Sequence, residues 1–258
     1  MPKFSANLTF LFNELPFMER FEAAAKAGFK AVEYMAPYPY PADEIKAALQ
    51  ANDLVQALFN LPTGDWDHGE RGMACIPGRE AEFKEGVAKA IGYAQALDCR
   101  KINCLSGKLP VGVPRDVATA TMIGNLKFAA AELKRYGIML VTEPINSFDI
   151  PGYFVNRTSE ALSILDAVGS DNLLVQYDVY HAQRMEGELG NTLTNYLSRI
   201  GHIQIADNPG RNEPGTGEIN YAWILKHIDA IGYDGWVGCE YKPKTTTVEG
   251  LDWMKAFR

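Results

Sequence analysis

The sequence predicts a (β/α)8 barrel that occupies the chain as a single domain, residues 1–258. Eight short apolar segments alternate with helical patterns from one end of the chain to the other, and no linker, low-complexity stretch or break in composition interrupts them. Strict alternation of this kind indicates a parallel sheet covered by helices. A length of 258 residues suits one such barrel. The alternative, a doubly wound open sheet, usually carries a glycine-rich turn after its first strand, and residues 7–13 contain no glycine.

Four strand and helix pairs are expected in the first half of the chain. Apolar runs predict strands at residues 4–10, 31–35, 54–59 and 101–105. Helical spacing of apolar residues predicts helices at residues 16–28, 42–52, 80–97 and 116–136. The first helix ends at Gly28, a typical C-terminal residue. Residues 60–78 form an unusually long connection, and its Trp66 and run of charges indicate a lid or rim over the barrel.

The second half repeats the pattern. Residues 138–143 form an apolar strand that must end near Pro144, because proline cannot donate a hydrogen bond to a sheet. The same reasoning from apolar runs and helical spacing gives the remaining elements. Strands are expected at residues 173–178, 202–206 and 236–239, and helices at residues 159–168, 193–200, 221–231 and 251–257.

The composition argues against several classes of protein. A formal net charge of −7 and a pI near 5.2 disfavour nucleic-acid binding, which usually requires a basic surface. The four cysteines form no Cys-x-x-Cys pair, as expected in a reducing compartment. The chain enters a strand pattern at Phe4 without a signal sequence, and no apolar run reaches membrane-spanning length. We therefore expect a cytoplasmic protein that binds neither membranes nor nucleic acids.

Oxygen-bearing side chains lie at or near the ends of the last four strands. Glu143, Asp178 and Glu240 come at C-terminal ends, and Gln204 lies in the middle of its strand. Because these ends surround the active-site mouth of a barrel, we expect the four side chains to converge on one point. Three carboxylates at one point require a cation, and an all-oxygen set of ligands favours Mg²⁺, or else Mn²⁺, over zinc. The alternative for each acid is to cap a helix or to pair with a basic side chain at the rim.

Two further residues are candidates for contact with a substrate. His181 follows Asp178 by three residues, so it faces the mouth if the chain turns inward there. Arg211 lies in the loop after the seventh strand, and its guanidinium is suited to binding a substrate carboxylate. The alternative for both is a structural role. His202, placed at the opening of the seventh strand and so at the opposite end of the barrel, and His227, on a helix, are assigned to structure.

Five motifs from the second half of the chain, taken together, resemble the hydroxypyruvate isomerase family of the xylose-isomerase-like TIM barrels. These are Val-Thr-Glu143-Pro-Ile-Asn, Gln-Tyr-Asp178-Val-Tyr-His181, His-Ile-Gln204-Ile-Ala-Asp, Gly-Thr-Gly-Glu-Ile-Asn-Tyr221 and Gly-Cys-Glu240-Tyr-Lys-Pro. The match extends over essentially the whole chain. The resemblance implies isomerisation of hydroxypyruvate to tartronate semialdehyde with a bound divalent metal and no organic cofactor. It also implies that Glu143 and Glu240 are the pair that transfers the proton.

The resemblance determines the type of reaction better than the substrate. A sister group isomerises 2-oxo-tetronates, four-carbon relatives of hydroxypyruvate, and sugar 3-epimerases use similar glutamates on longer ketoses. The epimerases usually have histidine where this chain has Gln204, a departure that agrees with Mg²⁺. Two other classes are a metal-dependent phosphoesterase of the apurinic endonuclease type, which needs more than the four histidines present, and a non-catalytic binding barrel. Because related barrels often associate, the resemblance is also compatible with a homo-oligomer.

The expected chemistry follows from moving a carbonyl between adjacent carbons. A proton leaves the carbon next to the carbonyl, an enediolate forms, and a proton returns one carbon over. Two carboxylates beside the substrate suffice, in an order that the sequence does not assign, and a metal stabilises the developing charge. The sequence therefore predicts an isomerase that acts on a small 2-oxo or hydroxy acid.

Overall fold

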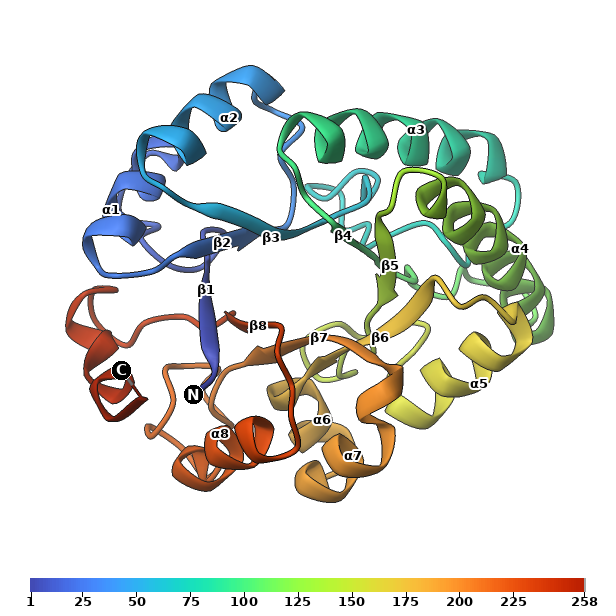
Figure 1. Ribbon diagram of the computed structural model, residues 1–258. Helices are drawn as coiled ribbons and strands as arrows, with labels where there is room; N and C mark the ends of the chain where they lie inside the picture. The colour runs from blue at the N-terminus through green and yellow to red at the C-terminus, as the bar shows by residue number, and fades with distance from the viewer. Residues whose placement is uncertain (258) are drawn as a thin grey trace.

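Eight parallel strands close into a barrel in the computed structural model, which describes residues 1–257 (Figure 1). The strands are β1 (Lys3–Asn7), β2 (Ala31–Tyr34), β3 (Val55–Asn60), β4 (Lys101–Cys104), β5 (Met139–Thr142), β6 (Leu173–Asp178), β7 (Ile200–Ile205) and β8 (Trp236–Cys239). Each strand pairs with the next, and β8 closes the barrel against β1 through pairs such as Ser5 with Gly238. The predicted (β/α)8 barrel is confirmed.

The helices form a ring around the outside of the strands (Figure 1). They are η1 (Phe17–Glu19), α1 (Arg20–Lys26), α2 (Ala42–Ala51), α3 (Glu80–Ala96), α4 (Arg115–Lys134), α5 (Thr158–Val168), α6 (Val179–Met185), α7 (Leu189–Tyr196), η2 (Leu197–Arg199), α8 (Tyr221–Ala230) and η3 (Glu249–Phe257). In α4, Leu126, Ala129 and Leu133 are buried, a spacing that places them on one face toward the sheet. None of the helices within residues 1–257 has both the length and the apolar character that crossing a membrane requires.

The connection after β6 differs from the prediction. A single helix was expected at residues 193–200, but α6 begins directly after Asp178, and α7 and η2 follow it. The reason is local, because Oδ1 of Asp178 accepts a hydrogen bond of 2.8 Å from the backbone N–H of Tyr180 and so caps α6. This helix carries His181 and holds it beside the strand end.

The start of β7 also differs from the prediction. The strand begins at Ile200, two residues earlier than expected, because the preceding helical segment ends at Arg199. His202 therefore lies inside the barrel, fully buried, with Nε2 2.9 Å from Oε2 of Glu33. The expected position of His202 at the opposite end of the barrel is wrong, although the residue still serves a structural contact.

Candidate active site

The predicted site residues gather at the carboxyl ends of the strands, around a cavity of about 450 Å³. Glu143 directly follows β5, Asp178 ends β6, and Glu240 directly follows β8. Gln204 lies on β7 and contributes to the cavity wall together with Glu143 and Glu240. Asp178 is buried beside Glu143 and His181. The barrel thus brings together four residues that are far apart in the sequence.

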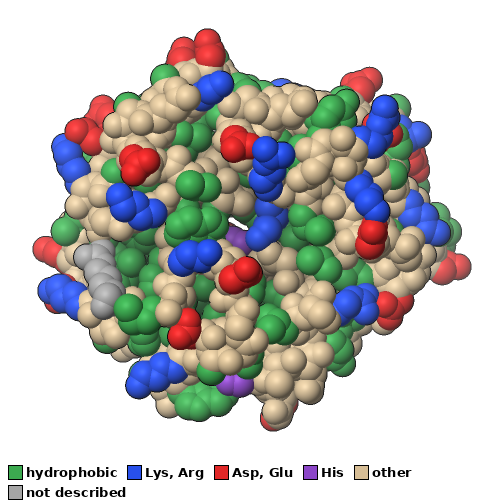
Figure 2. Space-filling view, in the orientation of Figure 1, with side chains coloured by type: hydrophobic (Ala, Val, Ile, Leu, Met, Phe, Trp, Pro, Cys, Tyr) green, Lys and Arg blue, Asp and Glu red, His purple; other side chains and the backbone are tan. Residues whose placement is uncertain are grey.

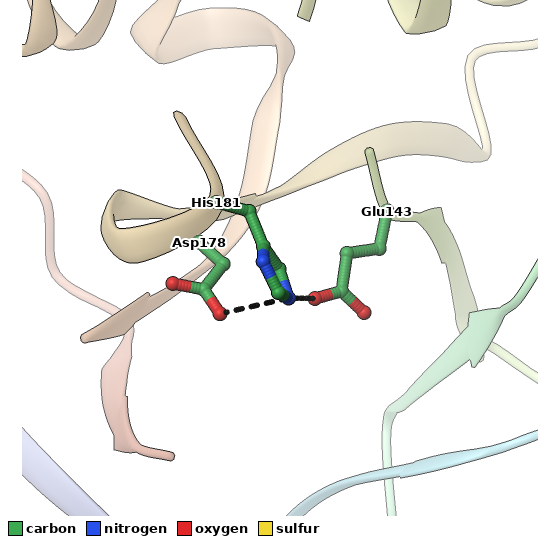
Figure 3. A group of neighbouring side chains, drawn as sticks. All are labelled: Glu143, Asp178 and His181. Carbon is green, nitrogen blue, oxygen red and sulfur yellow. Dashed lines mark ion pairs between the residues drawn. The ribbon is translucent and has the colours of Figure 1, made fainter. Parts of the chain in front are cut away.

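Glu143, Asp178 and His181 point toward one another (Figure 3). Nε2 of His181 lies 3.8 Å from Oε1 of Glu143 and 3.6 Å from Oδ2 of Asp178. Both carboxylate oxygens are buried and have no hydrogen-bond partner among the described residues. Buried acceptors without a donor are uncommon, and one ligand atom from each residue lies within 4.8 Å of the others. The three residues are therefore compatible with a bound divalent cation.

His181 is oriented by a neighbour on the connection after β5. Its Nδ1 lies 2.6 Å from Nδ2 of Asn146, an amide nitrogen that can only donate. Burial and the charges of Arg211 and Arg184 lower the pKa of His181 well below its ordinary value, so the ring is neutral. With Nδ1 accepting from Asn146, the hydrogen of the neutral ring is on Nε2, where it can be donated to a substrate oxygen. Binding of a cation through Nε2 requires the other tautomer.

Gln204 contacts Glu240 through the nitrogen of its side chain. Nε2 donates hydrogen bonds of 2.6 Å to Oε2 of Glu240 and 2.7 Å to Oε1 of Glu33. Its Oε1 accepts a 2.7 Å hydrogen bond from Nε2 of Gln176. The structure therefore places Gln204 against Glu240, as predicted, but a cation would bind its oxygen only if the amide turned over.

Arg211 lies deep in the same site. Its Nη2 donates a 2.6 Å hydrogen bond to Oε1 of Glu240 and lies 4.0 Å from Oδ2 of Asp178. The guanidinium also lies over the rings of Phe10 and Tyr180, at 4.9 and 5.3 Å. Its backbone has a φ of 55°, an uncommon value for a residue with a side chain. The loop after β7 thus brings the Arg211 charge to the acids at some conformational cost.

Burial raises the pKa values of three acids of the site. Burial, with the charges of Glu240 and Asp178, raises the pKa of Glu143 well above its ordinary value. Burial also raises the pKa of Glu240 to about 8 and that of Asp178 to about 6, although Arg211 acts in the opposite direction on both. Three carboxyl groups with raised pKa values in one place are ready either to exchange protons or to bind a cation that displaces those protons.

Glu33, on β2, is a site residue that the sequence analysis missed. It is fully buried and accepts hydrogen bonds from Ser5 (2.7 Å), Asn7 (3.3 Å), His202 (2.9 Å) and Gln204 (2.7 Å). Burial disfavours the charged carboxylate, but His202 and the other donors more than offset this effect and lower its pKa. An acid in the middle of an otherwise apolar strand was the signal available in the sequence.

Two amides that the sequence analysis also missed hold Glu143. Nδ2 of Asn103, on β4, donates a 3.0 Å hydrogen bond to Oε2 of Glu143, and Nε2 of Gln176, on β6, donates one of 2.9 Å to the same atom. One oxygen of Glu143 is therefore fixed by donors, and the other is left free toward His181. Like Glu33, both amides interrupt apolar strands and point into the barrel.

The long connection between β3 and α3 reaches the cavity, as predicted for a rim. Trp66 and Arg71 contribute to the cavity wall. His68, which the sequence left unassigned, pairs instead with Asp65 at 2.8 Å and is exposed. The part of the rim that faces the site is therefore the Trp66 and Arg71 pair.

Comparison with known proteins identifies the family. Residues 21–257 match the family described as xylose isomerase-like TIM barrel. The chain belongs to this family. It is 57% identical over 258 residues to hydroxypyruvate isomerase of Escherichia coli (strain K12), an alignment that covers 100% of both chains. It is 46% identical over 257 residues to 2-oxo-tetronate isomerase of Cupriavidus necator, covering 100% of this chain and 99% of that relative.

This xylose isomerase-like TIM barrel also resembles a solved structure from Brucella melitensis. That protein is described as an AP endonuclease of family 2 and has a TM-score of 0.98 and 45% sequence identity, with 100% of both chains covered. The resemblance stated from the sequence motifs is confirmed by the relatives named as isomerases.

Proposed function

We propose that this chain is an isomerase that interconverts hydroxypyruvate and tartronate semialdehyde (2-hydroxy-3-oxopropanoate). The observation that carries the proposal is the 57% identity, over 100% of both chains, to the Escherichia coli protein named hydroxypyruvate isomerase. The site supports it, because Glu143 and Glu240 are buried acids with raised pKa values on the wall of one cavity. Such acids are suited to removing and returning a proton near neutral pH.

We propose a divalent metal, Mg²⁺ before Mn²⁺, as the resident cofactor, with no organic cofactor. Glu143, Asp178, Gln204 and Glu240 would hold it, and the unpartnered oxygens of Glu143 and Asp178 support this assignment. When bound, such a metal stabilises negative charge on substrate oxygens. Oxygen ligands favour Mg²⁺, and the nearby His181 is the only imidazole in the candidate metal group among the described residues.

In the proposed reaction, one glutamate takes a proton from C3 of hydroxypyruvate, leaving an enediolate. A proton is then returned to C2, and a hydroxyl proton passes from the oxygen on C3 to the oxygen on C2, so that the aldehyde forms at C3. Glu143 and Glu240 are assigned to these transfers. Asn103 and Gln176 hold Glu143, while Arg211 and Gln204 hold Glu240.

His181 and Arg211 are proposed to bind the substrate at its reacting end. His181 has an Nε2–H available for a substrate oxygen, as argued above from the Asn146 contact. Arg211 lines the cavity, and its Nε has no partner among the described residues. Its charge beside Glu240 also limits the build-up of negative charge as the proton is moved.

The four-carbon alternative, isomerisation of a 2-oxo-tetronate, is supported by the 46% identity to the Cupriavidus necator protein of that name. Because the chemistry is the same, the two substrates differ only in an added hydroxymethyl group. The higher identity to the hydroxypyruvate isomerase favours the three-carbon substrate.

An endonuclease activity is the second rival, because the Brucella melitensis structure carries that description. The net charge of −7 disfavours it. Figure 2 shows Lys and Arg side chains interspersed with Asp and Glu on the face in view, rather than gathered into one basic patch. We therefore propose a small-molecule substrate and a cytoplasmic location, without nucleic-acid or membrane partners.

The test is to incubate the metal-loaded protein with hydroxypyruvate in D₂O and to follow the products by NMR. We expect tartronate semialdehyde that carries deuterium at C2. The same experiment with a 2-oxo-tetronate compares kcat/KM for the two substrates. Absence of product and of deuterium exchange with hydroxypyruvate would exclude the proposed reaction, and a larger kcat/KM for the tetronate would favour the alternative.

A further inference from the structure

The charges on the cavity wall are unevenly distributed around the barrel. The acids on this wall, Glu143, Asp149 and Glu240, all come from the second half of the barrel. Among the described residues that line the cavity and precede residue 110, Arg71 is the only one with a charge. The other lining residues of that part of the chain are uncharged and include Met35, Leu58 and Trp66. Among the described residues, Arg71 is therefore the one charged side chain that the first half of the barrel contributes to the cavity wall.

Four basic side chains line the cavity, and they differ in their partners. Arg184 pairs with Asp149 at 2.8 Å, and Arg211 pairs with Glu240 at 2.6 Å. Within residues 1–257, Arg71 forms no ion pair, and Nη1 of its guanidinium donates hydrogen bonds to the backbone carbonyls of Trp66 (2.9 Å) and Glu70 (2.6 Å). The N–H groups on Nε and Nη2 are left for another acceptor.

Lys242 is the fourth basic residue, and it contrasts with Arg71. Lys242 also lacks an ion pair, and its side chain is exposed, without a hydrogen bond from its ammonium group to any described residue. Arg71 is half-buried, and Cζ of its guanidinium lies over the indole ring of Trp66, 3.8 Å from the ring centre. Since an ordered guanidinium loses less entropy on binding than a free ammonium group does, Arg71 is the better anion site.

The loop that carries Arg71 is itself firmly held. Oε2 of Glu70 accepts a 2.6 Å hydrogen bond from the backbone N–H of Asp65, and Oε1 accepts one of 2.5 Å from Arg79. The backbone N–H of Gly72 donates to the carbonyl of Thr63 at 2.9 Å. Gly72 has a φ of 105° and packs so closely on the chain after β4 that a Cβ atom would overlap it. The loop therefore presents Arg71 to the cavity in a fixed position.

We propose that Arg71, supported by Trp66, binds the carboxylate of the substrate. The substrate then lies in the cavity with its carboxylate on Arg71 and its C2 and C3 atoms toward Glu143 and Glu240. Bidentate pairing with a planar guanidinium also fixes the orientation of the carboxylate. This inference rests on the proposed 2-oxo acid substrate. It assigns to Arg71 the carboxylate contact that the sequence suggested for Arg211, whose Nη2 is engaged by Glu240.

The inference is tested with Arg71→Met in the Mg²⁺-loaded full chain. Glycerate, which resembles the substrate but cannot isomerise, is the binding probe in calorimetry, and glycerol is its uncharged counterpart. Loss of a charge-assisted pair of this kind typically costs about 2 kcal/mol or more, so we expect the Kd for glycerate to rise by about 30-fold. In turnover, kcat/KM should fall for hydroxypyruvate but hardly change for dihydroxyacetone, in which a hydroxymethyl group replaces the carboxylate.

Lys242→Met is the matched control, because it removes the same charge from the wall of the same cavity. We expect it to change the Kd for glycerate by less than about threefold, as for an exposed charge. Arg71→Lys keeps the charge but loses the planar contact with Trp66, so its Kd should lie between those of the wild type and Arg71→Met. Thermal melting of each variant establishes that it is folded, and Arg71→Lys carries the test if Arg71→Met is not.

Three outcomes would overturn the inference. These are an unchanged Kd for glycerate in both Arg71 variants, equal losses on hydroxypyruvate and dihydroxyacetone, or an equal effect of Lys242→Met. Failure of the proposed reaction would look different. The wild type would then bind glycerate but not turn over hydroxypyruvate. If Arg71→Met still lost glycerate binding, the anion site would be supported and only the reaction would be wrong.

Discussion

Glu33 and His202 meet inside the barrel, where Nε2 of His202 donates a 2.9 Å hydrogen bond to Oε2 of Glu33. Burial lowers the pKa of His202, so the imidazole is neutral and the charge resides on Glu33. Asn7 and Gln204 each donate to both Glu33 and Glu240. The buried Glu33 is therefore connected to a proposed catalytic acid through two shared amides.

Gly238, on β8, leaves the space that Glu33 occupies. A Cβ atom at this position would overlap the carboxylate of Glu33. We expect Gly238→Ala to lower the free energy of unfolding by about 1–3 kcal/mol, as typical for overpacking. Urea unfolding measures it. Gly92→Ala in α3 is the matched control, because nothing lies within 4 Å of the added Cβ, and it should raise stability by about 0.5–1 kcal/mol. Equal effects of the two substitutions would contradict the packing argument.

Glu143→Gln and Glu240→Gln should each stop most of the turnover. Glutamine keeps the shape of the side chain but cannot take up a proton, and removal of a positioned acid or base typically costs about 10²–10⁴-fold in rate. The double variant should be hardly worse than either single variant, because the two groups serve one transfer. Turnover and solvent-deuterium exchange measure the loss, and metal content is determined in parallel.

Glu85→Gln, on the exposed face of α3, is the control for these two substitutions and should retain normal turnover. Should either active-site variant keep near-normal turnover with metal bound, that glutamate is a ligand or a structural acid. One carboxylate would then serve both carbons.

Asp178→Asn should weaken metal binding while the fold persists. Oδ2 of Asp178 is a buried oxygen without a donor, whereas Oδ1 caps α6, a contact that the amide oxygen of asparagine can keep. Isothermal calorimetry with Mg²⁺ and Mn²⁺ measures the change, for which we expect at least about 10-fold, because loss of even an outer-shell partner of a metal typically costs about 10–100-fold in affinity. Asp171→Asn, an exposed acid paired with Lys134, should leave the affinity unchanged. The same affinity in both variants would remove Asp178 from the metal site.

The stabilisation that Mg²⁺ gives should increase with pH. In the metal-free protein, the pKa of Glu240 is raised from 4.5 to about 8 and that of Asp178 from 3.8 to about 6. A raised pKa stabilises the folded protein below the ordinary pKa, and this stability is lost as pH rises through the raised value. A bound cation reverses the loss, so the increase in Tm on adding Mg²⁺ should be larger at pH 8 than at pH 5.

Scanning calorimetry with excess Mg²⁺ or with EDTA at the two pH values gives this difference. Glu33 and His202, whose pKa values are lowered, make the protein less stable at acid pH in both forms, so their contribution largely cancels. An equal increase in Tm at pH 5 and pH 8 would contradict the prediction that the cation displaces protons.

The sequence by itself determined the elements of the barrel and the strand ends that carry acids. Apolar runs and helical spacing depend on residues within a few positions of one another, so they could be recognised without the tertiary structure. The position of Glu143 before Pro144 and of Asp178 at the end of an apolar run followed from the same local pattern. Because strand ends share one face of a barrel, their approximate convergence could also be predicted.

Only the tertiary structure decided which atoms meet. Glu33 and His202 are 169 positions apart, and Gln204 reaches across to Glu33 from another strand. The strand pairing shifts its register between Val32 and Glu33 and between Val175 and Gln176, which changes where the following side chains point. The pairing of Arg211 with Glu240, and the position of Arg71 on the cavity wall, depend on loops that long-range contacts hold in place. Such directions are set by closure of the sheet and by distant packing partners, and no local sequence pattern encodes them.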